Sequence, residues 1–145
     1  MAFSTINVCI LCEAVRPELG GKNILLGYYG IAPYVRIQIQ NFAQPTMLVF
    51  AFAGGPGHGH FRIDLRITAP NGATFDAQGF EGDLRPQASY TNIFMAFQGV
   101  LPGPGNYTAA LLVNGAVQFQ APFALDPAPA PAAPGLPPLP QHHPN

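Results

Sequence analysis

The sequence predicts an all-β protein, an immunoglobulin-like antiparallel β-sandwich of about seven to nine strands. Apolar and polar residues alternate along several segments, which is the pattern of a strand with one buried face. Glycine- and proline-rich turns separate these segments at short intervals. No segment has the apolar spacing of an amphipathic helix, so the crossover helices of a parallel α/β sheet are missing. A closed barrel of the same strands is the alternative architecture.

The alternation is clearest in three segments, 34–41, 60–68 and 116–125. In each, every second side chain is apolar and the residues between them are mostly polar, which predicts one core-facing side per strand. The core-facing residues are Val35, Ile37, Ile39, Phe61, Ile63, Leu65, Ile67, Val117, Phe119, Ala121, Phe123 and Leu125.

Turn sequences set the boundaries of the remaining strands. The pair Asn114-Gly115 is typical of a tight type I′ hairpin, and Gly20-Gly21 and Pro70-Asn71-Gly72 mark other reversals. The expected strands, in chain order, are 4–12, 23–30, 34–41, 46–53, 60–68, 73–78, 90–100 and a hairpin over 106–125.

The composition changes after residue 125. Residues 1–125 are expected to form one β-sandwich domain, and the Pro/Ala-rich residues 126–145 a disordered, extended tail, because proline cannot join a strand ladder. Segments 134–137 and 137–140 have the PxxP form that docks in aromatic grooves. A plain flexible extension is the alternative interpretation of the tail.

The charge content excludes several classes of protein. Lys22 is the only lysine, five arginines accompany it, and the net charge is −1, so no basic surface is available for nucleic acid. The longest apolar run, 47–53, is too short to span a bilayer, and we expect no membrane insertion. The first residues lack the basic region of a signal peptide, which predicts a cytoplasmic protein.

The residues from Pro86 to Leu125 include no Asp, Glu, Lys or Arg. Strands 90–98 and 107–113 within this stretch are partly apolar on both faces, although a strand of a two-layer sandwich needs only one apolar face. We therefore predict a non-enzymatic module that self-associates or binds a protein partner through strands 90–113. The candidate interface residues are Tyr90, Phe94, Met95, Phe97, Leu111, Leu112 and Val113.

The neutral stretch also allows three alternative interpretations. A loop or the proline-rich tail could cover the second apolar face. The chain could also be a structural subunit of a larger phage-like or secretion-type assembly, with the tail as its connector. A small-ligand or metal-binding protein is the third alternative.

The first thirty residues carry a family resemblance. Cys12-Glu13-Ala14-Val15-Arg16, followed by the segment from Gly21-Lys22 to Gly27-Tyr28-Tyr29-Gly30, resembles the opening of a bacterial family known only as a domain of unknown function. The resemblance covers most of residues 5–125 and implies a small cytoplasmic β-sandwich with no established activity. Within this segment, Gly27 inside a strand predicts a bulge or a close backbone approach.

Few residues of the sequence could take part in redox, metal-binding or catalytic chemistry. Cys9 and Cys12 form a C-x-x-C, but along a strand their α-carbons would lie about 10 Å apart with side chains on opposite faces. A disulfide needs α-carbons closer than about 7 Å, and zinc needs further ligands. We therefore expect buried free cysteines.

The histidines and carboxylates have no catalytic spacing. His58 and His60 follow a glycine-rich loop and are the only candidate pair for a metal, and Asp76, Glu81 and Asp83 share a loop whose spacing does not match an EF-hand. Ser4 and Ser89 lie in no nucleophile elbow. We expect no enzymatic activity, no metal and no cofactor.

Overall fold

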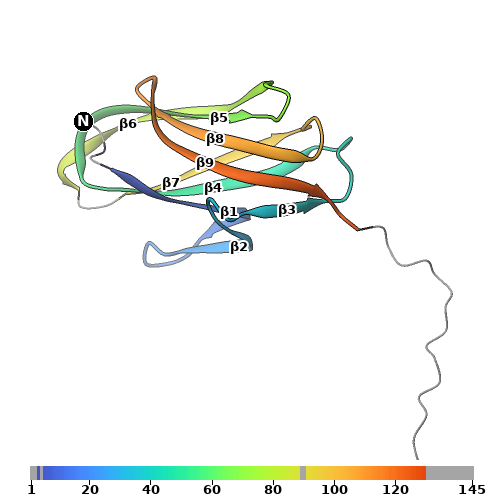
Figure 1. Ribbon diagram of the computed structural model, residues 1–145. Helices are drawn as coiled ribbons and strands as arrows, with labels where there is room; N and C mark the ends of the chain where they lie inside the picture. Colours follow the sequence, from blue (N-terminus) through green and yellow to red (C-terminus); the bar gives the residue numbers. More distant parts are fainter. Residues whose placement is uncertain (1–2, 4, 89–90, 130–145) are drawn as a thin grey trace, which may run out of the picture.

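The computed structural model describes residues 3, 5–88 and 91–129, and this part of the chain forms two facing β-sheets (Figure 1). The predicted all-β sandwich is thus confirmed. Its nine described strands are β1 (Ile6–Pro17), β2 (Asn23–Ile31), β3 (Arg36–Ile39), β4 (Thr46–Gly54), β5 (Gly57–Thr68), β6 (Thr74–Ala88), β7 (Thr91–Gly99), β8 (Gly105–Val113) and β9 (Ala116–Pro127). None of the described residues forms a helix long and apolar enough to cross a membrane.

The strands divide unequally between the sheets. One sheet has four strands in the order β2-β1-β4-β7, and the other has five in the order β3-β9-β8-β5-β6. Neighbours are antiparallel except β3 and β9, which run parallel. The Arg36 guanidinium of β3 donates two hydrogen bonds, of 2.9 and 2.8 Å, to the Asp126 carboxylate of β9. This two-pronged ion pair holds the short parallel strand at the edge of the sheet.

The core lies between the inner faces of the two sheets. Phe50 of β4 meets Phe123 of β9 edge to face, with ring centroids 5.6 Å apart, and Tyr107 of β8 stacks on the same Phe123 at 5.5 Å. The Phe50–Phe123 contact joins the two layers, and the Tyr107–Phe123 stack links neighbouring strands of one sheet; aromatic side chains favour both contacts beyond simple burial. The Tyr107 hydroxyl also donates a 2.6 Å hydrogen bond to the Gly103 carbonyl, as the tyrosine corner of immunoglobulin-like sandwiches does.

The strand expected at 73–78 is much longer than predicted. β6 continues to Ala88, so Asp76, Glu81 and Asp83 belong to a strand and not to a glycine-rich loop. Gly79 permits this, because a Cβ there would overlap the Asp64 carboxylate and the Ile63 carbonyl of β5. The glycine that suggested a loop is instead required for close pairing of two strands.

The C-terminal strand also runs slightly past the expected end of the domain. β9 continues to Pro127, and the Ala128 amide donates a 3.0 Å hydrogen bond to the Ile39 carbonyl. Residues 130–145, which include both PxxP segments, lie outside the described residues.

Cys9 and Cys12 are both buried and free, which confirms the prediction. Burial raises the pKa of the Cys9 thiol from 9.0 to about 12, because the apolar interior disfavours a thiolate. The Cys9 thiol therefore keeps its proton in the folded state over a pH range in which it loses that proton in the unfolded state. This stabilising effect is complete below about pH 9 and is lost as the pH rises toward 12.

We expect the free energy of unfolding to fall between about pH 8 and pH 10.5 by about 2 kcal/mol more in the wild type than in Cys9→Val. Urea denaturation of both proteins at the two pH values measures the difference. Groups other than Cys9 titrate in both proteins and cancel. Parallel pH profiles would show that the thiol is not desolvated as described.

Candidate ligand-binding cleft

The predicted interface of strands 90–113 does not form one surface. β7 belongs to the four-stranded sheet and β8 to the five-stranded sheet, so their outer faces point to opposite sides of the sandwich. Four of the candidate residues are core residues, and two are half-buried on opposite outer faces. The core residues are Met95, Phe97, Leu111 and Val113; the outer ones are Phe94 and Leu112. Tyr90 lies outside the described residues.

The prediction of a non-enzymatic module that docks or self-assembles through this surface is therefore wrong. A physical reason is visible in β8, whose outward residues Ala110 and Leu112 lie beside Arg66 and Asp64 of β5. The neighbouring strand supplies the charges that β8 lacks. The neutral stretch of sequence is thus not a neutral area of surface.

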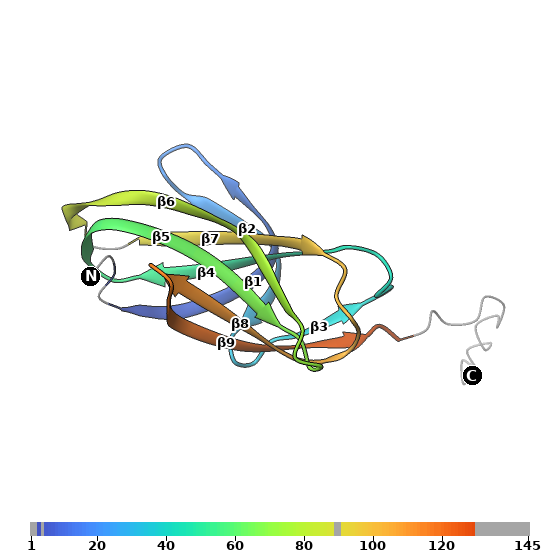
Figure 2. The same ribbon diagram turned by 90° about the horizontal axis from the view of Figure 1, so that it is seen from above.

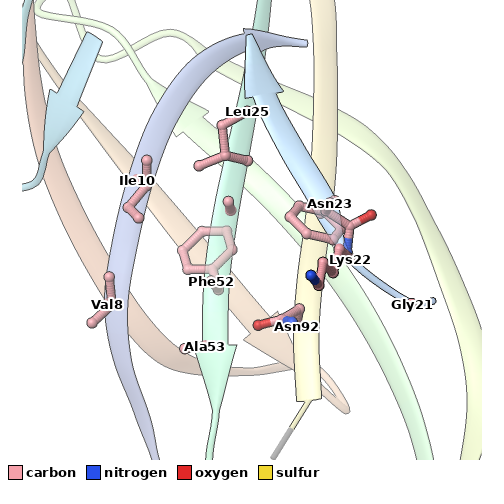
Figure 3. Close-up of a pocket in the computed structure, with 11 residues that line it drawn as sticks. Val8, Ile10, Gly21, Lys22, Asn23, Leu25, Phe52, Ala53 and Asn92 are labelled. Carbon is pink, nitrogen blue, oxygen red and sulfur yellow. The ribbon is translucent and has the colours of Figure 1, made fainter. Parts of the chain in front are cut away.

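The outer face of the four-stranded sheet is covered in part by its own chain. After a bulge between Leu11 and Cys12, β1 leaves β4 and continues with β2 alone. We call residues 12–28 of this hairpin the arm. In Figure 2 the arm runs across the direction of β4 and β7, and Figure 3 shows β2 passing over both strands. The arm and the sheet enclose a cleft between them.

This cleft has a volume of about 440 Å³, which is within the range of small-molecule sites. The sheet contributes mainly apolar residues from β1, β4 and β7, and the arm adds Leu25 and a polar segment. The lining residues are Val8, Ile10, Gly21, Lys22, Asn23, Leu25, Ala51, Phe52, Ala53, Asn92 and Phe94.

Small side chains make the sheet side of the cleft hollow. Val8 is paired with Ala53, and Ile10 with Ala51, which is in turn paired with Phe94. These five side chains share the outer face because paired residues of antiparallel strands point to the same side. The two alanines of β4 thus lie between larger apolar side chains of β1 and β7, which leaves a trough along the middle strand.

A contact at the base of the arm fixes its direction. Gly27 has a φ of +60°, and a Cβ there would lie 2.5 Å from Glu13 Cδ. The Tyr29 hydroxyl donates a 3.2 Å hydrogen bond to Glu13. Desolvation, followed by the negative charge of Glu13, raises the pKa of Tyr29 to about 12. The close approach at Gly27 is made by the exposed side chain of Glu13 and not by backbone, and a bulge lies nearby, between Leu11 and Cys12.

The three polar side chains of the cleft are all hydrogen-bond donors. Lys22 carries the only charge among the lining residues, while Asn23 and Asn92 contribute amides. A site of this kind can hold an acceptor group or an anion at one place and an apolar body elsewhere. The sequence pointed to none of this, because a Gly-Gly-Lys turn looks like any solvated hairpin tip.

The other candidate residues lie on the outer face of the five-stranded sheet. His60 of β5 lies 3.3 Å from Asp83 and 4.0 Å from Glu81 of β6, and Arg62 bonds both Asp64 and Glu81. These are exposed cross-strand pairs of a charged sheet surface. Within the described ranges, no group of three or more His, Cys, Asp or Glu residues is placed to hold a metal ion.

Comparison with known proteins gives little further information. No family model and no curated protein matches the chain, which is consistent with an uncharacterised family, and the bacterial resemblance stays a prediction. A solved structure of Pseudomonas fluorescens alkylpurine DNA glycosylase AlkC bound to DNA containing an abasic site analog matches at 17% identity and a TM-score of 0.39. The match covers 65% of this chain and 28% of that chain.

Likeness at this TM-score assigns neither a fold nor an activity to the present chain. The expectation that the chain does not bind nucleic acid stays a prediction.

We expect Gly27→Ala to destabilise the protein by about 2 kcal/mol, because alanine is strained at positive φ and its Cβ would meet Glu13. Gly20→Ala is the matched control: Gly20 has a φ of +85°, but a Cβ there meets nothing within 4 Å. The control should lose only about 1 kcal/mol. Chemical denaturation measures both, and equal losses would show that the Gly27–Glu13 contact is unimportant.

Proposed function

We propose that this protein binds an elongated small molecule in the cleft between the arm and the four-stranded sheet. The observation that carries the proposal is the trough over Ala51 and Ala53, which is apolar, lies on the outer side of the sheet and is roofed by the arm at its Ala51 end. Outer faces of two-layer sandwiches are ordinarily solvated and polar. An apolar outer face under a crossing hairpin is instead the arrangement of a ligand site.

The burial of the surrounding residues supports this interpretation. Val49 and Ala51 point outward from β4, yet each is only 7% exposed, and Cys12, paired with Val49, is fully covered. The arm therefore closes the sheet tightly near its base. Farther along, at Ala53 and Asn92, the arm stands away from the sheet and the cleft opens. An open end beside a closed one favours a long ligand over a flat protein partner.

The size of the cleft agrees with the same class of ligand. Its volume of about 440 Å³ is near the lower end of the range for drug-sized molecules, roughly 300 to 1,000 Å³. Stable protein interfaces need about 800 Å² from each partner, which a trough this narrow does not offer. A small molecule is thus the occupant that the geometry supports best.

The test uses N-phenyl-1-naphthylamine, a neutral apolar dye that fluoresces when it leaves water. We expect the wild type to bind the dye and Ala53→Phe to bind it at least tenfold more weakly, because the new ring fills the trough. Amide chemical-shift changes in the wild type should cluster on residues 8–10, 22–25 and 51–53.

Ala96→Phe is the matched control for this experiment. Ala96 also points outward from β7, where it is paired with Val49, and it is exposed but does not line the cleft. This variant should bind the dye like the wild type. The proposal fails if the wild type does not bind the dye, or if Ala53→Phe binds it as tightly as Ala96→Phe does.

A further inference from the structure

The polar residues of the cleft lie toward its β7 side, which also carries Phe94. In Figure 3 the labelled apolar side chains Val8, Ile10 and Leu25 lie toward one side, and Lys22, Asn23 and Asn92 lie toward the other. Lys22 and Asn23 come from the arm and Asn92 from the start of β7, so the polar end is built from both walls. The cleft therefore has a polar end and an apolar end. We expect its ligand to have a polar group at one end and an apolar body at the other.

Among the described residues, no carboxylate forms an ion pair with the ammonium group at the polar end of the cleft. All seven Asp and Glu side chains have a side-chain partner: Glu13 with Tyr29, Glu18 with Arg16, Asp64 and Glu81 with Arg62, Asp76 with Arg66, Asp83 with His60, and Asp126 with Arg36. Among the described residues, none of them pairs with Lys22. The other cation without such a pair in this part of the chain, Arg85, does not line the cleft.

We infer that the ligand of the cleft is an anionic amphiphile, whose acidic head is held by Lys22 and whose hydrocarbon body lies in the trough over Ala51 and Ala53. This inference rests on the proposed function and specifies the class of molecule. Lys22 is exposed, so its ammonium group can reach an acidic head at the mouth of the cleft, where the attraction depends on the salt concentration. The amides of Asn23 and Asn92 add directed donors for the oxygens of a carboxylate or phosphate head.

Three matched probes test the inference by displacement of N-phenyl-1-naphthylamine: decanoate, decyl phosphate and 1-decanol. They share the same hydrocarbon chain and differ in the head group. We expect decanoate or decyl phosphate to bind the wild type about tenfold more tightly than decanol does. Preference between the two anions identifies the head as a carboxylate or a phosphate. Raising the salt concentration should weaken the anions but not the alcohol.

The decisive variant is Lys22→Met, which keeps a long apolar side chain and removes the charge. It should lose the preference for anions, about tenfold, while still binding decanol like the wild type. Lys22→Arg should retain the preference. Arg16→Met is the control for charge on the same arm, since Arg16 is already paired with Glu18 at 3.0 Å, and it should behave like the wild type.

Two results would overturn the inference while leaving the proposed function intact. One is equal binding of decanol and the anions by the wild type. The other is a preference for anions that persists unchanged in Lys22→Met. If none of the three probes and no dye bind, the proposed function itself fails, and the inference fails with it.

Discussion

The bulge between Leu11 and Cys12 determines the outer surface of this protein. Before it, β1 pairs with β4 from Ile6 onward, with a register shift between Ile6 and Val8, and β2 joins its other edge only at Ile10. The last pair with β4 is Cys12 and Val49, and beyond it only the hairpin partner remains. The extra residue is Tyr29 of β2, because Leu11 pairs with Gly30 and Cys12 with Tyr28, and such a bulge increases the bend and twist of the hairpin. Here that bend carries the hairpin across the sheet it came from, where an undistorted strand would extend the sheet.

This course of the chain explains why the outer face of the four-stranded sheet tolerates apolar residues. A sandwich normally hides one face of each sheet and exposes the other. In this sheet the arm covers part of the second face, so Val8, Ile10 and Phe94 are half-buried and not fully exposed. Among the described residues no hairpin crosses the outer face of the five-stranded sheet, which carries the exposed cross-strand pairs of β5 and β6. The asymmetry in charge between the two faces thus follows from the asymmetry in how they are covered.

The sequence was a good guide to the strands and a poor guide to the surfaces. Alternation in 34–41, 60–68 and 116–125 predicted strands that form at Arg36–Ile39, Gly57–Thr68 and Ala116–Pro127, because side chains on opposite sides of a strand meet opposite environments. Val117 was wrongly expected to face the core: it is 54% exposed, because the register of β8 and β9 shifts between Leu111 and Leu112. The lack of charged residues in 86–125 led to the wrong prediction of an uncharged interface. A surface is formed by residues that are neighbours across strands, and these need not be close in sequence. β7 and β8 are consecutive in sequence but lie in different sheets, and Leu112 lies beside Asp64 of β5. Strand order is set by long-range packing, which alternation does not encode.

The cleft could be anticipated only in part for a related reason. Gly27 indicated a close approach, but nothing in the sequence shows that Glu13 fills the space or that the hairpin then crosses β4 and β7. The length of β6 could not be predicted for the same reason. Gly79 is typical of a loop, and only the structure shows that it lies against Asp64 and Ile63 of the neighbouring strand. A glycine in the sequence indicates that a position has no side chain, but only the structure shows which neighbouring group occupies that space.

The base and the tip of the arm differ in how firmly they are held, and this difference bears on how the cleft can work. At the base, Glu13 contacts Gly27 and accepts a hydrogen bond from Tyr29. At the tip, Gly20 and Gly21 both have positive φ, and a Cβ on either would meet nothing within 4 Å. The bend is therefore fixed by packing, whereas the turn that carries Lys22 is shaped by its own backbone alone. A fixed base keeps the trough open, and an unpacked tip lets the ammonium group adjust its position to the head of whatever lies in the trough.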